Sequence, residues 1–128
     1  MKCREFQFGD WCCNEYGLPM QMVDLGKDYA YATYEGDEGY PWLFSDSKDD
    51  HPHPIEITIE LLKANGWKDA EFWCEYQDGN NTIQYCPPDM RGKINGIEIE
   101  HFKCEYVHEY QHLLRLCGLD ELADNFKI

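Results

Sequence analysis

Residues 108–112 read His-Glu-Tyr-Gln-His, a pattern whose residue types and spacing could hydrolyse a bond with the help of zinc. In a helix His108 and His112 lie one turn apart, so both imidazoles can reach one Zn²⁺. Glu109 can then act as the general base that takes a proton from a metal-bound water. The spacing therefore points to a small zinc-dependent hydrolase with His108 and His112 as ligands and Glu109 as the catalytic residue.

A catalytic zinc site needs a third protein ligand, and this requirement weighs against the hydrolase. Only 16 residues follow His112, and the carboxylates among them are Asp120, Glu121 and Asp124. Arg115 also lies on the side of the histidines, where an unpaired cation opposes a divalent metal. We therefore expect no catalytic residue, no metal and no other cofactor, and zinc hydrolysis remains the alternative.

The helix that carries this pattern is expected over residues 105–117, ending at Gly118. Its apolar residues share one face at helical spacing: Tyr106, Val107, Tyr110, Leu113, Leu114 and Cys117. On this pattern the two histidines and Glu109 lie on the opposite, solvated face. A shorter helix or turn is expected over residues 120–126.

A second helix is expected near residues 59–65, with Thr58 as its N-cap and Asn65-Gly66 at its end. Between the helices, Asp78-Gly79-Asn80-Asn81 predicts a hairpin. Residues 94–102 are expected to form a further strand, with Asn95-Gly96 as a turn or bulge near its start.

The first third of the chain reads as short strands joined by turns. Apolar-rich runs at 5–13 and 19–24 flank a turn over 14–17, and residues 28–34 alternate, with Tyr29 and Tyr31 on one side and Ala30 and Ala32 on the other. An SH3-like arrangement fits this strand spacing. Residues 36–54, interrupted by glycine and proline, are expected to form a loop that Trp42-Leu43-Phe44 docks onto the sheet.

These elements predict a single α+β domain over residues 1–128, built from a curled, mainly antiparallel sheet packed with two helices. A length of 128 residues and a hydrophobic content of 43% are sufficient for one folded core.

There is no glycine-rich phosphate loop and no serine in a nucleophile elbow.

The charge is strongly acidic, with 25 acidic against 11 basic residues and a formal net charge of −14. Residues 28–62 hold nine acids and one base, Lys48, for a net −8. Because such a surface repels phosphate backbones, ordinary nucleic-acid binding is not expected. The stretch is either a solubilising surface or a mimic of nucleic acid that inhibits a host defence protein.

The seven cysteines have no zinc-finger spacing, and we expect free thiols. No apolar run is long enough to cross a membrane, and no apolar segment follows the basic residues at the N-terminus. The protein is therefore expected to be cytoplasmic, with no membrane contact.

Two stretches resemble a family of short proteins of uncharacterised function from Bacteroides-group gut bacteria and their prophages and mobile elements. The first, residues 54–62, reads Pro-Ile-Glu-Ile-Thr-Ile-Glu-Leu-Leu, and the second, residues 106–113, reads Tyr-Val-His-Glu-Tyr-Gln-His-Leu. Where this chain has Glu109 and His112, the family pattern has Gln and Asn, which implies that the zinc-like string arose on an ordinary helix. The matching polar residues of the second motif are His108 and Gln111.

The function that fits these observations is a non-enzymatic accessory protein of a prophage or mobile element that acts through protein–protein contacts. An acidic stretch with an exposed aromatic residue is the expected contact surface. The partner-contact candidates are Trp42, Asp46, Asp49, Asp50, His108 and Gln111.

Overall fold

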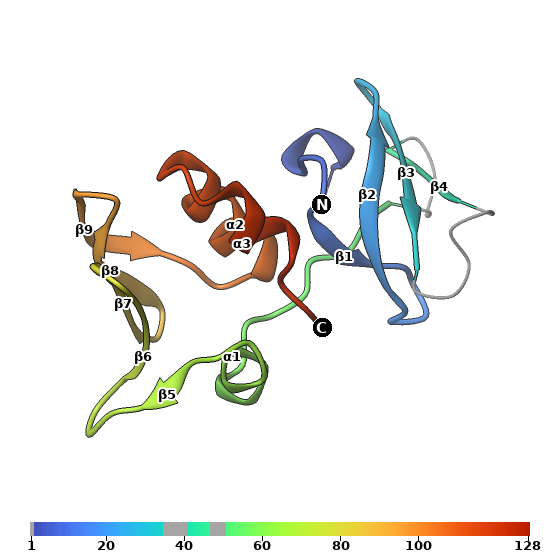
Figure 1. The fold of residues 1–128 in the computed structure, drawn as a ribbon. Helices are drawn as coiled ribbons and strands as arrows, with labels where there is room; N and C mark the ends of the chain where they lie inside the picture. Colours follow the sequence, from blue (N-terminus) through green and yellow to red (C-terminus); the bar gives the residue numbers. More distant parts are fainter. Residues whose placement is uncertain (1, 35–40, 47–50) are drawn as a thin grey trace. The chain divides into compact units, whose positions relative to one another are not determined.

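A computed structural model describes residues 2–34, 41–46 and 51–128 and contains two antiparallel sheets and three α-helices (Figure 1). One sheet is strongly curled into a half-barrel, and the predicted α+β class is confirmed. The chain divides into two compact units, which we call unit 1 (Met1–Ile55 with Ile128) and unit 2 (Glu56–Lys127). The expectation of one domain over residues 1–128 stays a prediction, as does the SH3-like arrangement.

Unit 1 contains the four-stranded sheet, whose strands follow one another in chain order. The strands are β1 (Trp11–Cys13), β2 (Pro19–Leu25), β3 (Tyr29–Thr33) and β4 (Trp42–Ser45). The turn predicted over 14–17 joins β1 to β2, and the side chain of Asn14 accepts hydrogen bonds from the backbone N of Tyr16 and of Leu18, both at 3.0 Å. Asparagine favours such turns because its side chain can bond the backbone that follows it.

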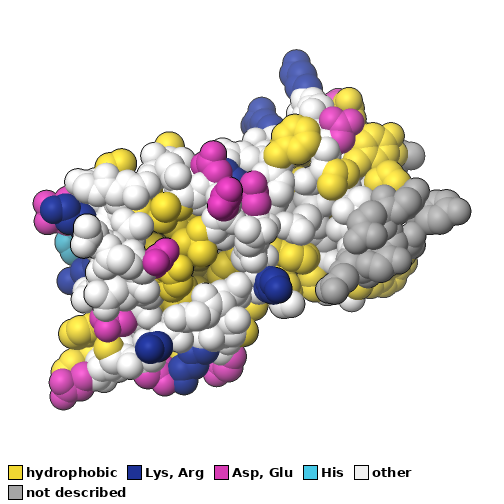
Figure 2. All heavy atoms as spheres, viewed as in Figure 1, with side chains coloured by type: hydrophobic (Ala, Val, Ile, Leu, Met, Phe, Trp, Pro, Cys, Tyr) yellow, Lys and Arg dark blue, Asp and Glu magenta, His cyan; other side chains and the backbone are white. Residues whose placement is uncertain are grey.

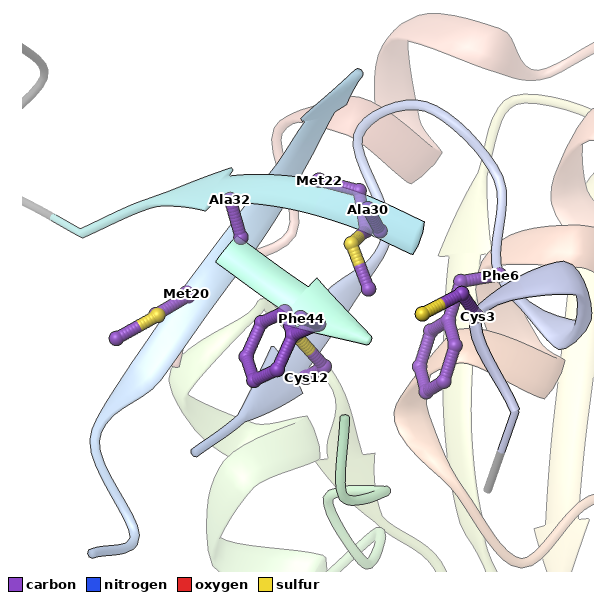
Figure 3. Packing of buried hydrophobic residues seen from close by; sticks show 8 residues of the cluster. All are labelled: Cys3, Phe6, Cys12, Met20, Met22, Ala30, Ala32 and Phe44. Atoms are coloured by element: carbon purple, nitrogen blue, oxygen red, sulfur yellow. The ribbon is translucent and has the colours of Figure 1, made fainter. Parts of the chain in front are cut away.

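The core of unit 1 lies on one face of this sheet (Figure 3). The predicted alternation of β3 is confirmed, since Ala30 and Ala32 are fully buried whereas Tyr29 and Tyr31 are not. The buried cluster consists of Cys3, Phe6, Cys12, Met20, Met22, Ala30, Ala32 and Phe44. The small alanines leave room for the large Phe44 side chain from the neighbouring strand.

Two expectations for unit 1 were wrong. Trp42–Ser45 is not part of a loop but forms β4, because it pairs in register with β3, a partner distant in sequence. The apolar run at 5–13 is not a single strand either. Its start belongs to the short 3-10 helix η1 (Cys3–Glu5), and β1 begins only at Trp11.

Unit 2 contains the five-stranded sheet, again in chain order. The strands are β5 (Lys68–Asp69), β6 (Cys74–Asp78), β7 (Asn81–Cys86), β8 (Asp89–Ile94) and β9 (Ile97–Lys103). The hairpin predicted at 78–81 is confirmed, with Asp78 paired to Asn81. The strand predicted over 94–102 is in fact β9 preceded by a hairpin turn, where Asn95 and Gly96 have φ angles of 49° and 78°. This conformation favours Asn-Gly, so the turn expected as one of two alternatives at these residues is confirmed. It connects β9 to β8, and β8 is a strand that was not predicted.

Three helices lie on one side of this sheet (Figure 1). Helix α1 (Ile59–Ala64) begins as predicted, with the Leu61 backbone N donating to Thr58 Oγ1 at 3.1 Å. Helix α2 (Val107–Leu116) and the short α3 (Asp120–Asp124) also lie within the predicted ranges. Trp67, Tyr110 and Phe126 form the aromatic centre of the unit, with ring centroids 5.7 Å apart for Trp67–Tyr110 and 5.6 Å apart for Tyr110–Phe126.

Among the residues described, no helix has both the length and the apolar character required to cross a membrane. All seven cysteines are free thiols, and five of them are buried.

Candidate functional site

The carboxylate of Glu109, the proposed general base, closes the N-terminus of α2. Its Oε1 accepts hydrogen bonds from the backbone N of Glu105 and of Tyr106, both at 3.0 Å. This is the glutamate half of a capping box, which satisfies backbone donors that have no partner within the helix. Glu109 is half-buried, and its carboxylate has a structural role that explains its position at the start of the helix.

His108 and Gln111 are both buried, which corrects the expectation that His108 lies on the solvated face. Neither has the exposed side chain that a partner-contact residue requires. His108 is 3% exposed, and its ring stacks on that of Tyr106 at 6.0 Å with an interplanar angle of 10°. Gln111 is fully buried, and its Nε2 donates to the carbonyl of Ala123 at 2.9 Å. Because α3 turns back beside α2, the helix has a buried polar side as well as a buried apolar side.

The remaining polar residues of α2 are also engaged. The ring of the half-buried His112 meets that of His108 edge to face, with centroids 5.6 Å apart. Arg115, expected to oppose a metal, is paired instead, with its Nη2 3.1 Å from Oδ1 of Asp124. Asp124 was itself a possible third ligand. Within residues 2–34, 41–46 and 51–128, no three His, Cys, Asp or Glu side chains are placed to hold a metal ion.

Two of the expected contact residues in unit 1 have structural roles. Trp42 is half-buried rather than exposed, because its register with Ala32 places it against the core cluster. Asp46 Oδ1 accepts a hydrogen bond from the backbone N of Cys3 at 2.8 Å, and this bond holds the pKa of the carboxyl below its usual value. Asp49 and Asp50 lie outside the described residues.

The outer face of the same sheet carries a different set of aromatic and apolar side chains. Tyr31 lies at its centre, in register with Asp24 of β2 and with Leu43 of β4. Tyr29 is two residues from Tyr31 on the same face, and Val23 occupies a β-bulge in β2. We call this set, Val23, Asp24, Tyr29, Tyr31 and Leu43, the tyrosine face.

The tyrosine face exposes much of its apolar area to solvent. Tyr29 is 41% exposed, Val23 43% and Leu43 49%. The rings of Tyr29 and Tyr31 meet edge to face with centroids 6.0 Å apart, which restricts both side chains. Figure 2 shows hydrophobic side chains at the surface over β2 and β3.

Only part of the tyrosine face could be found from the sequence. The alternation of residues 28–34 places the two tyrosines on one side, but nothing local places Leu43 beside them. That neighbour depends on the register of β3 with β4, and β4 lies within the stretch 36–54 that was expected to be a loop.

Comparison of the chain with protein-family models, with curated proteins and with solved structures finds no match.

Proposed function

We propose that this protein is a non-enzymatic interaction module and that the tyrosine face binds a basic segment of a partner protein. The observation that carries the proposal is the cluster of Tyr29, Tyr31 and Leu43 on the solvent side of a sheet whose other side is fully packed. Tyrosine is enriched in protein interfaces because it buries a large rigid ring and keeps a polar hydroxyl at the rim.

The charge around the face supports a basic partner. Asp24 lies beside Tyr31 in register, and Asp28 precedes Tyr29 in the turn that joins the two strands. Residues 28–62 have a net charge of −8. Complementary charge accelerates association and discriminates against acidic competitors, while the apolar centre supplies most of the affinity.

The resemblance in residues 54–62 and 106–113 supports an accessory role in a prophage or mobile element. The alternative of a zinc hydrolase gains no support from α2, where Glu109 caps the helix and Arg115 is paired with Asp124. The contact surface proposed here therefore differs from the one expected from sequence: it keeps the acidic character and replaces Trp42 with the tyrosine face.

The test compares capture of partners by the wild-type protein and by a Tyr31→Thr, Leu43→Thr double variant. Threonine is β-branched and favours strands, so the sheet should persist while the apolar contact area is lost. The matched control is Tyr16→Thr, since Tyr16 is 79% exposed in the turn between β1 and β2 and lies outside the tyrosine face. Circular dichroism and thermal unfolding check the fold of each variant.

We expect a partner that is retained by the wild type and the control and is lost by the double variant, with affinity reduced about 30-fold or more. Raising the salt concentration should weaken the complex, since rim charges are screened over roughly 8 Å at physiological ionic strength. Equal capture by the folded double variant and the wild type would refute the assignment of this face.

A further inference from the structure

Unit 2 has a polar hollow of about 510 Å³ on the outer face of β7, β8 and β9, away from the tyrosine face in sequence and independent of it. Its volume lies in the range of small-molecule sites, roughly 300–1,000 Å³. Basic, acidic and amide side chains line it in strand register. Gln84 is paired with Arg91, and Lys93 is paired with Thr82 on one side and Glu98 on the other.

A β-bulge builds one side of the hollow. The register between β8 and β9 shifts between Met90 and Gly92, so Arg91 alone opposes both Glu100 and His101. Both residues belong to the four consecutive residues of β9, Glu98 to His101, that line the hollow. His101 has a φ of 56°, a left-handed conformation that is uncommon for a residue other than glycine. Bulges and strained residues of this kind recur at functional sites.

Gly92 forms part of the wall of the hollow and cannot be replaced without moving the backbone. Its φ is 150°, and a Cβ built there would lie 2.0 Å from the carbonyl oxygen of Thr82. Arg91 and Lys93 are two residues apart in β8 and so lie on one side of the strand, and the bulge sets Glu100 and His101 of β9 opposite Arg91. The site is therefore shaped by the backbone and does not depend on side-chain rotamers alone.

The charges that line the hollow are of both signs. Arg91 and Lys93 are cations within a protein of net charge −14, and Glu98 and Glu100 stand beside them. None of these four groups is ion-paired with another residue in the described part of the chain. In Figure 2 the edge of the molecule over β8 and β9 carries basic, acidic and histidine side chains.

We propose that this hollow binds a short zwitterionic peptide, with the peptide's carboxylate on Arg91 and its ammonium group between Glu98 and Glu100. The planar guanidinium of Arg91 matches a carboxylate in a two-bond geometry, and Gln84 beside it offers an amide donor. A polyanion such as a polyphosphate would meet the two glutamates, and a polycation would meet Arg91 and Lys93. Only a ligand that carries a negative and a positive charge can pair with both the two cations and the two glutamates.

The distance between the cationic and the acidic side chains favours a peptide over a single amino acid as the ligand. Arg91 opposes Glu100 at the bulge, whereas Glu98 lies further along the neighbouring strand, opposite Lys93, which is two residues from Arg91. Two residues along a strand span about 7 Å and neighbouring strands lie about 4.8 Å apart. The two ends of a dipeptide or tripeptide can span this separation, whereas the charges of an α-amino acid are held on one carbon atom.

The test is a titration of isotopically labelled protein with trialanine, followed by backbone amide chemical shifts in two-dimensional NMR spectra. We expect saturable shifts around Thr82, Gly92 and His101, with a Kd of about 1 mM or tighter. Trialanine with an amidated C-terminus and trialanine with an acetylated N-terminus should each bind about tenfold more weakly or worse.

Arg91→Gln and Glu98→Gln provide the protein side of the test, and both side chains are exposed, so the fold should persist. We expect each variant to lose the response to trialanine, whereas Lys68→Gln, an exposed base on β5 outside the hollow, should bind as the wild type does. Absence of saturable shifts, binding unchanged in Arg91→Gln, or an equal response to acetate and to trialanine would each overturn the proposal. Failure here would not affect the tyrosine face, which is tested on a different unit.

Discussion

The carboxylate of Glu109 accepts a hydrogen bond from the backbone N of Tyr106 at 3.0 Å. This contact gives the glutamate of the His-Glu-Tyr-Gln-His motif a structural role. Tyr106 is the N-cap of α2, so the bond forms part of the cap that begins the helix. A string that resembles a catalytic motif therefore serves here as the start of an amphipathic helix.

Removing this cap should destabilise the protein without abolishing its fold. Glu109→Ala is expected to lower the free energy of unfolding by about 1 kcal/mol, while Glu109→Gln should retain most of it, because glutamine also completes a capping box. Urea denaturation measures both, with the exposed Glu71→Ala as a control. Equal losses in the Ala and Gln variants would show that the negative charge, rather than the cap, matters.

Purified protein should not carry stoichiometric zinc, because no third ligand joins His108 and His112 within the described residues. Mass spectrometry of untagged protein prepared without chelator measures the metal content. About one zinc per chain in the wild type, lost in His112→Ala, would contradict this expectation and revive the hydrolase.

Because of the hydrogen bond from the backbone N of Cys3 to Asp46, the free energy of unfolding of unit 1 should depend on pH in the acidic range. Since folding lowers the pKa of Asp46, the contribution of the ionised carboxylate is fully present above its unfolded value of 3.8 and is lost as the pH falls through the lower folded value. Asp46→Asn should therefore be less stable than the wild type at neutral pH, with the difference shrinking below about pH 4. A difference that stays constant down to pH 2 would show that the charge plays no part.

Two glycines of the β8–β9 hairpin should respond very differently to alanine. Gly92→Ala places a methyl group 2.0 Å from the carbonyl oxygen of Thr82 and should cost about 3 kcal/mol or more, or prevent folding. Gly96→Ala has open space around the new atom and only the cost of its positive φ, about 1 kcal/mol. Thermal unfolding of the two variants compares them, and similar losses would mean that the backbone of Thr82 leaves room for a side chain at residue 92.

Asn65 should hold the C-terminal segment in place. Its Nδ2 donates to the carbonyl of Lys127 at 2.7 Å, and its Oδ1 accepts from the backbone N of Lys127 at 2.8 Å. Asn65→Ala is expected to cost about 1–2 kcal/mol and to accelerate amide hydrogen exchange near Phe126, whose ring packs on Tyr110. Unchanged hydrogen exchange in this segment would show that the packing of Phe126 alone is enough to hold the C-terminal segment in place.

The sequence by itself predicted the features that depend on near neighbours. The alternation of residues 28–34, the Thr58 cap and the hairpin at 78–81 are all confirmed, because each is set by side chains within a few residues of the backbone they control. The same holds for the extent of α2, where helical spacing marks the apolar side.

Only the tertiary structure decided which polar residues face solvent and which strands are neighbours. His108 was expected on the solvated face and Gln111 as a partner contact, yet both are buried, and the Ala123 carbonyl of α3 accepts a hydrogen bond from Gln111. The strand β4 has too few residues to be recognised locally, and it exists because β3 supplies its hydrogen-bond partners. Burial and pairing of this kind depend on segments far apart in the chain, and no local pattern of residue types records where such segments meet.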